Sequence, residues 1–109
     1  MDISEQYVQL KDFLNYLKFE KRYSQHTFIA YQKDLEQFLF FVRDEYDAPS
    51  LNNITSSIIR TWLASLKEQG VTTKSINRKI SSLKSFFKYL MKTGELKQTP
   101  MNIICLLYT

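Results

Sequence analysis

Apolar side chains recur at intervals of three and four residues along most of the chain. This spacing is that of one face of an α-helix, and no segment shows the alternation of apolar and polar residues that marks a strand. The pattern predicts helices over about residues 4–21, 25–43, 56–69 and 73–92. Their apolar stripes are Tyr7, Leu10, Phe13, Leu14 and Leu17; Phe28, Tyr31, Leu35, Phe38, Leu39 and Val42; Ile58, Ile59, Trp62, Leu63 and Leu66; and Ile76, Ile80, Leu83, Phe86, Phe87 and Leu90. The sequence therefore predicts an all-α fold.

Short polar residues and glycines mark where these helices begin and end. The candidate N-caps are Ser4, Ser24, Thr55 and Thr72. Gly70 suits the left-handed position that ends the third helix, and Gly94 ends the fourth. Because few residues join the first helix to the second and the third to the fourth, each pair should form a hairpin. The longer loop over residues 47–53 allows the two hairpins to pack across one another. We expect a four-helix orthogonal bundle of two crossed helical hairpins.

The length and the single cysteine limit the class of protein. A chain of 109 residues supports one hydrophobic core. We expect one domain over residues 1–100, with residues 101–109 forming an apolar tail or the start of an interdomain linker. Cys105 alone cannot form an internal disulfide, and neither a signal sequence nor a run of about 18 apolar residues is present. These features predict a cytoplasmic protein without a membrane partner.

The formal net charge of +4 is unevenly distributed. Residues 1–54 carry six basic and nine acidic side chains, whereas residues 55–109 carry nine basic and two acidic ones. Residues 71–94 contain no acid and six cations: Lys74, Arg78, Lys79, Lys84, Lys88 and Lys92. Like charges one turn apart repel one another, and phosphates would relieve that repulsion. The fourth helix is therefore a candidate surface for a polyanion, although a merely solubilising basic face would have the same spacing.

Three stretches of the chain resemble one family in the same order along the sequence. They are YSQHT at residues 23–27, then Tyr31, Asp34, Leu35 and Phe38, and then SINRKISSLKSFFKYL at residues 75–90. Together they resemble the N-terminal core-binding domain of the tyrosine recombinases, of the Xer and phage-integrase types, over about residues 7–103. Residues 105–109 do not resemble the basic interdomain linker of that family.

The resemblance implies both a fold and a function. It implies a SAM-like four-helix domain that forms half of a clamp on double-stranded DNA, with the second and fourth helices presented to the major groove. In such recombinases a separate C-terminal domain holds the catalytic Arg, Lys, His and nucleophilic Tyr. We therefore expect no catalytic residue in this chain, no metal ion or other cofactor, and other recombinase protomers as partners of the full-length protein.

Carried over residue by residue, the resemblance implies six contacts with DNA. They are His26 and Thr27 at the start of the second helix, and Lys74, Asn77, Arg78 and Ser82 on the fourth. Lys74 is expected to meet a phosphate, and Arg78 a phosphate or a guanine edge. The smaller polar side chains among the six offer short-range contacts.

Other interpretations of these residues stay open. His26 fits a solvated helix cap as well as it fits a DNA contact. It is the only histidine, and no CxxC motif occurs, so a metal site is not expected. The alternative function is a helical protein-interaction module that binds its partner through the aromatic side chains of Phe19 and Phe40 and the apolar tail. Salt separates the two functions, because only contacts with phosphates weaken steeply with ionic strength.

Overall fold

The structure, a computed structural model, describes residues 7–47 and 49–101 of the chain. The α-helices in these residues are α2 (Val8–Phe19), α3 (Gln25–Tyr46), α4 (Ser56–Glu68) and α5 (Thr73–Lys92), and a short 3-10 helix, η1 (Leu51–Asn53), precedes α4. The predicted all-α fold is confirmed, and these two ranges contain no strand. The predicted end of α3 at residue 43 is too early, because α3 continues to Tyr46 and stops at Asp47, whose φ of 61° is left-handed.

Local side chains explain where three of the helices begin. Ser24 Oγ accepts a hydrogen bond from the Thr27 N–H at 3.3 Å, Thr55 Oγ1 accepts one from the Ile58 N–H at 3.3 Å, and Thr72 Oγ1 accepts one from the Ser75 N–H at 3.2 Å. Each of these bonds satisfies a backbone donor that the first helical turn leaves without a partner. Gly70 follows α4 with a φ of +87°, which a residue with a Cβ rarely adopts. These predicted helix boundaries are confirmed. The first helix is shorter than the predicted range 4–21, because α2 begins at Val8, with Tyr7 and not Ser4 as its N-cap, and ends at Phe19.

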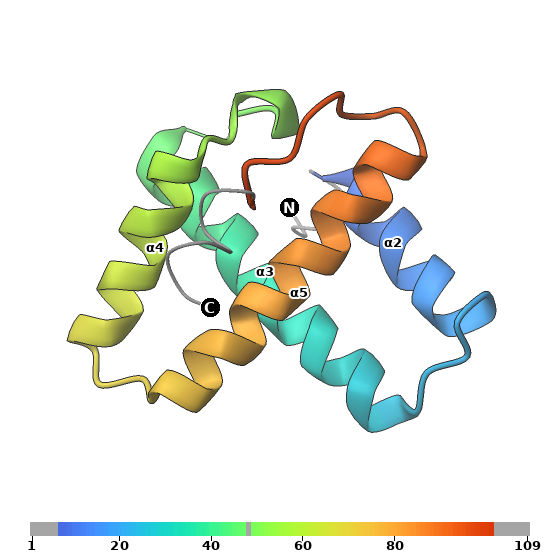
Figure 1. Cartoon of the computed structure of the whole chain (residues 1–109), viewed down its shortest axis with the longest axis horizontal. Helices are drawn as coiled ribbons and strands as arrows, with labels where there is room; N and C mark the ends of the chain where they lie inside the picture. Colours follow the sequence, from blue (N-terminus) through green and yellow to red (C-terminus); the bar gives the residue numbers. More distant parts are fainter. Residues whose placement is uncertain (1–6, 48, 102–109) are drawn as a thin grey trace.

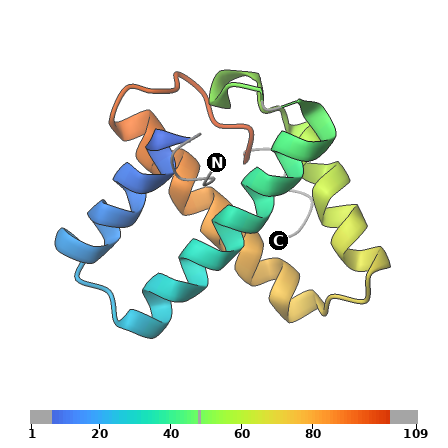
Figure 2. The same cartoon turned by 180° about the vertical axis from the view of Figure 1, so that it is seen from behind.

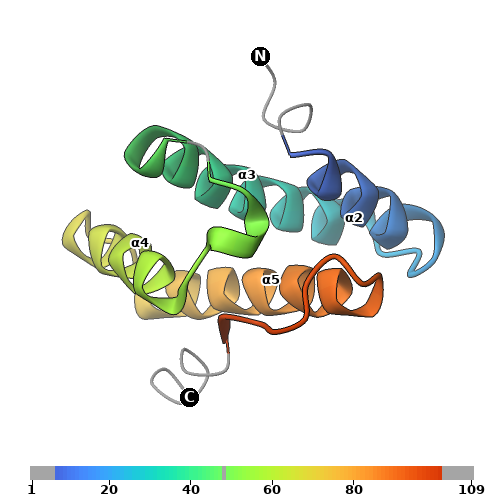
Figure 3. The ribbon, with the colours of Figure 1, turned by 90° about the horizontal axis from the view of Figure 1, so that it is seen from above.

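The two longest helices, α3 and α5, cross near the middle of the molecule (Figure 1). The hairpin of α2 and α3 forms one layer and the hairpin of α4 and α5 forms the other (Figure 3). The view from behind shows the same crossing, with α2 and α4 on opposite sides of it (Figure 2). The predicted bundle of two crossed helical hairpins is confirmed.

Aromatic side chains fill the space between the two layers. The ring of Phe13 on α2 meets Phe86 on α5 edge-on, with the ring centroids 5.4 Å apart. In the other half of the core, Phe38 on α3 meets Trp62 on α4 at 5.1 Å in the same T-shaped arrangement. All four side chains are buried, and such pairs add to the stabilisation that burial itself provides. The predicted role of Trp62 as a core residue is confirmed.

After α5 the chain turns back over the bundle and buries Leu96 and Met101 (Figure 1). The predicted apolar tail beyond this point, including Cys105, lies outside the described residues. The division between a domain over residues 1–100 and a tail over 101–109 therefore stays a prediction. None of the helices in the described part of the chain has the length and apolar character needed to cross a lipid bilayer.

Candidate nucleic-acid interface

A shallow hollow lies between the first turns of α3 and the middle of α5. Its volume is about 350 Å³, and it is lined by His26, Thr27, Ala30, Tyr31, Arg78, Ser81 and Ser82. Four of the six predicted DNA contacts therefore meet at one place, although α4 separates their helices in the sequence. The crossing of the two hairpins brings them together, since it lays the start of α3 against α5.

The cap of α3 holds the first side chains of this hollow in place. Ser24 accepts a hydrogen bond from the Thr27 N–H and donates one from Oγ to Thr27 Oγ1, at 3.0 Å. His26 is exposed beside them. The N-terminal turn of a helix also carries partial positive charge from its unpaired N–H groups. This end of α3 thus offers a hydroxyl, an imidazole and a favourable dipole to an anion.

The two remaining predicted contacts lie on α5 outside the hollow. Lys74 and Asn77 are both exposed, and Lys74 precedes Arg78 by one helical turn. A phosphate backbone that passed the hollow along α5 would meet them in succession. For all six residues, contact with DNA stays a prediction.

The carboxylate of Asp34 on α3 lies at the crossing with α5 and accepts hydrogen bonds from three side chains. Arg78 donates two, from Nη2 to Oδ1 at 2.9 Å and from Nε to Oδ2 at 3.2 Å. Lys79 Nζ donates to Oδ1 at 2.9 Å, and Ser82 Oγ donates to Oδ2 at 3.0 Å. Because Asp34 is buried, these four charge-assisted bonds stabilise a carboxylate that would otherwise be costly to remove from water.

Arg78 connects this buried carboxylate with the surface. Its side chain is 55% exposed, against 1% for Asp34, and it lines the hollow. Asp34 engages Nε and Nη2, so Nη1 is the guanidinium nitrogen without a hydrogen-bond partner among the described residues. The planar guanidinium is thereby held in one orientation before any ligand arrives.

Ser82 has a role that its sequence position does not reveal. It is buried, and its hydroxyl proton is committed to Asp34, so any contact with DNA would have to use the remaining lone pairs of Oγ. The sequence pattern places Ser82 on α5 as a small residue at the groove. The structure shows that it also completes the set of donors around the buried carboxylate.

Lys79 is the cation that the sequence pattern misplaces. The pattern groups it with the cations of the basic face, yet it is buried, and its ammonium donates to Asp34 and, at 2.7 Å, to Gln37 Oε1. The surface cations of α5 are therefore Lys74, Arg78, Lys84, Lys88 and Lys92. The sequence contained a signal for this burial, because position 79 lies three residues after Ile76 and four before Leu83, on the apolar stripe.

The sequence matches one family of known proteins. The family model described as "Phage integrase, N-terminal SAM-like domain" matches residues 10–94. The chain is 41% identical over 98 residues to a tyrosine recombinase XerC of Rickettsia prowazekii, covering 85% of this chain and 32% of that protein. It is 39% identical over 88 residues to the XerC of Oceanobacillus iheyensis, covering 81% and 28%.

A third XerC, from Lacticaseibacillus casei, is 34% identical over 92 residues, covering 84% of this chain and 31% of that protein. The chain thus spans about a third of the length of the curated relatives that it matches. No solved structure matches it. On the family match, the helical fold and these relatives, the chain belongs to the family of phage-integrase N-terminal SAM-like domains, of the kind found in Xer-type tyrosine recombinases.

Proposed function

We propose that this domain binds double-stranded DNA through the start of α3 and the exposed face of α5, as the N-terminal part of a site-specific recombinase. The observation that carries the proposal is the hollow in which His26, Thr27 and Arg78 meet. Three of the contacts implied by the family resemblance thus lie together on one surface. That surface continues along a helix whose exposed charges are all positive.

The physical basis is attraction between this face and the phosphate backbone. No acidic residue occurs in α5 to offset its cations. Lys74 and Arg78 lie one turn apart, a spacing at which like charges repel mildly in the free protein. Bound phosphates attract both side chains and relieve the repulsion between them, and their binding releases the counterions of the DNA. Arg78, held by Asp34, offers a fixed guanidinium for a phosphate or for the acceptors of a guanine edge.

The activity of the whole protein is part of the same proposal. The curated relatives are tyrosine recombinases, and this chain matches about a third of their length. The family resemblance implies that a separate domain breaks and rejoins DNA through a 3′-phosphotyrosine intermediate, without a metal ion or nucleotide cofactor. In that arrangement this domain grips the half-site, and other protomers of the recombinase are its protein partners.

A second candidate function rests on exposed aromatic side chains. Phe19 at the end of α2 is 66% exposed. Phe40 on α3 is also exposed, and the guanidinium of Arg43 lies over its ring, 4.6 Å from the ring centroid. These side chains would suit a helical protein-interaction module. Binding through apolar surface depends little on salt, which separates this function from binding to phosphates.

The deciding experiment measures affinity for a labelled DNA duplex by fluorescence anisotropy over a series of salt concentrations. The test variant is Lys74→Gln with Arg78→Gln, which removes two charges. Glutamine is chosen because a glutamate at position 78 would face the buried carboxylate of Asp34. We expect weaker binding and a log–log salt slope that is shallower by up to about 1.8, at about 0.9 for each phosphate that the variant no longer neutralises.

The matched control is Lys11→Gln with Lys67→Gln, the same charge change at exposed positions of α2 and α4. We expect this control to keep most of the wild-type salt slope. Equal weakening in both double variants would show an effect of net charge alone and would remove α5 as the assigned DNA-facing helix. Binding of the wild type without salt dependence would favour the interaction module.

A further inference from the structure

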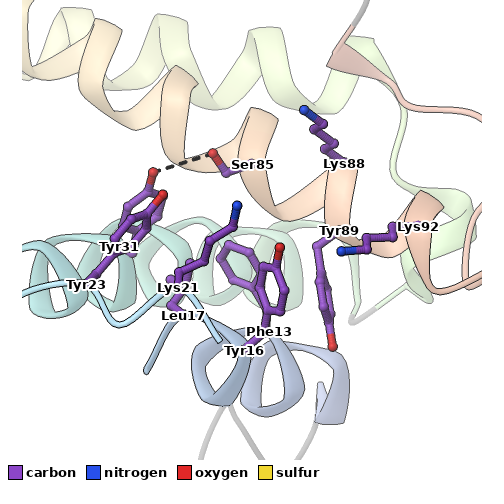
Figure 4. A pocket seen from close by; sticks show the side chains of 10 residues that line it. All are labelled: Phe13, Tyr16, Leu17, Lys21, Tyr23, Tyr31, Ser85, Lys88, Tyr89 and Lys92. Atoms are coloured by element: carbon purple, nitrogen blue, oxygen red, sulfur yellow. Dashed lines mark hydrogen bonds between the residues drawn. The ribbon is translucent and has the colours of Figure 1, made fainter. Parts of the chain in front are cut away.

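A second hollow, larger than the first, lies between α2, the start of α3 and the C-terminal half of α5. Its volume is about 470 Å³ (Figure 4). We call it the tyrosine pocket, and its lining consists of aromatic rings, a leucine, lysines and a serine: Phe13, Tyr16, Leu17, Lys21, Tyr23, Tyr31, Ser85, Lys88, Tyr89 and Lys92. None of the six predicted DNA contacts lines this tyrosine pocket, so it is a separate feature of the surface.

Lysines from two parts of the chain line the tyrosine pocket. Lys21 follows α2, whereas Lys88 and Lys92 lie one turn apart on α5 (Figure 4). The ammonium groups of Lys21 and Lys92 lie 5.8 Å and 5.2 Å from the ring centroid of Tyr16. Two cations at one ring repel each other, and an anion between them would be attracted by both. Among the described residues, none of the three lysines forms an ion pair, and no acid lines the pocket.

The remaining polar groups of the tyrosine pocket are neutral hydroxyls. Tyr31 Oη lies 3.5 Å from Ser85 Oγ, and the ring of Tyr31 stacks on Tyr23 with an interplanar angle of 11° (Figure 4). Burial raises the pKa of Tyr89 above its ordinary 10.0, and the nearby charges of Asp12 and Glu95 add to that rise. The phenol of Tyr89 is therefore uncharged at neutral pH. The pocket offers ammonium and hydroxyl donors with no negative charge of its own.

Tyr31 links the two hollows, because its side chain lines both of them. Lys88 also extends the row of cations on α5 that begins with Lys74 and Arg78. We propose that the tyrosine pocket is a second anion subsite, which takes a phosphodiester of the same duplex that contacts Arg78. This inference rests on the proposed DNA-binding function and adds to it a particular phosphate contact away from the groove-facing residues.

A phosphodiester and a carboxylate side chain both carry one negative charge over two oxygens, so the charge alone does not decide between them. We assign a phosphodiester, because a duplex bound at Arg78 brings further phosphates to the neighbouring pocket, and its two free oxygens accept bonds from an ammonium and from a hydroxyl together. Phosphate contacts of this kind fix the position of a protein on the duplex without reading its sequence. Because Tyr31 lines both hollows, an anion in the tyrosine pocket would lie beside the first hollow, within reach of the same DNA backbone.

The test compares two double variants in the same salt series on a labelled duplex. Lys88→Gln with Lys92→Gln removes two cations of the tyrosine pocket. Lys67→Gln with Lys97→Gln makes the same charge change at exposed lysines that lie outside α5 and line neither hollow. We expect the first variant to lower the log–log salt slope by about 0.9 for each phosphate that it no longer binds. The control should stay near the wild-type slope.

A second measurement locates the anion. Titration of the wild type with inorganic phosphate should shift the ring resonances of Tyr16 and Tyr31 in NMR spectra, and the Lys88→Gln, Lys92→Gln variant should show no such shift. A wild-type salt slope in that variant, with weakened binding in the Lys74→Gln, Arg78→Gln variant, would overturn the subsite and leave the DNA-binding function standing. Absence of duplex binding by the wild type would overturn the DNA-binding function itself.

Discussion

Arg78 donates two hydrogen bonds to the carboxylate of Asp34 across the crossing of α3 and α5, at 2.9 Å and 3.2 Å. The two partners lie 44 positions apart in the sequence, and one is buried while the other lines the surface hollow. The pair therefore connects the packing of the two hairpins with the orientation of a candidate DNA contact. A change at the buried partner should affect both folding and binding.

The first prediction concerns the stability that depends on Asp34. Asp34→Asn removes the negative charge that neutralises Arg78 and the buried Lys79. We expect the free energy of unfolding to fall by about 3 kcal/mol or more, because a buried cation without its partner is strongly destabilising. Urea denaturation followed by circular dichroism measures the change.

A surface pair provides the matched control for that change. Asp44 also pairs with an arginine, Arg43, at 3.0 Å, but its side chain is 63% exposed. We expect Asp44→Asn to lower the free energy of unfolding by less than about 1 kcal/mol. Similar decreases for the two variants would contradict the role assigned to the buried carboxylate.

The second prediction separates Lys79 from Asp34. Lys79→Met keeps an unbranched side chain of similar length at a buried position and leaves Asp34 with its bonds from Arg78 and Ser82. Gln37, the other partner of Lys79, is exposed and can bond to water instead. We therefore expect the free energy of unfolding to fall by about 1 kcal/mol, less than in Asp34→Asn, because the charge of Arg78 remains beside Asp34. A larger decrease than in Asp34→Asn would mean that the lysine, and not the carboxylate, anchors the crossing.

The third prediction is a decline of stability in alkaline solution. Burial raises the pKa of Tyr7 and of Tyr89 above the ordinary 10.0, so the folded state favours the neutral phenols. Their contribution to stability is fully present below pH 10 and declines as the pH rises from there through the raised pKa values of the folded protein. Denaturation curves measured at increasing pH should show this decline.

The control is a variant without the two phenols. Tyr7→Phe with Tyr89→Phe should have a flatter dependence of unfolding free energy on pH above 10. At neutral pH the same variant should be less stable by about 1 kcal/mol, because the Tyr7 hydroxyl donates to the Pro49 carbonyl at 2.8 Å. Identical pH profiles for the variant and the wild type would contradict the assignment.

The fourth prediction is that this chain by itself does not cleave DNA. Tyr7 is buried, and Tyr16, Tyr31 and Tyr89 are partly buried side chains that pack against the core. The family resemblance places the catalytic groups on a separate domain. Incubation with supercoiled plasmid should yield neither nicks nor a covalent protein–DNA adduct on denaturing gels. A phosphotyrosyl adduct mapped by mass spectrometry to any tyrosine of the chain would contradict the expectation.

The helices and their order could be predicted from the sequence, because both depend on local information. The spacing of apolar residues indicates the helical faces, the hydroxyls of Ser24 and Thr72 lie within three residues of the N–H groups that they cap, and Gly70 supplies a local left-handed turn. The crossed hairpins could be predicted as well, since short connections leave few other ways to bury the apolar faces.

The hydrogen-bond partners of the polar side chains at the crossing were decided only by the tertiary structure. The hydrogen bonds that join Asp34 to Arg78, Lys79 and Ser82 span 44 to 48 positions. The pattern along α5 could not show which of its cations meets a carboxylate, because that depends on where α3 crosses it. The sequence determined which residues are charged and which helix carries them. The crossing of the two hairpins determined which charges are buried, and which remain at the surface to meet a polyanion.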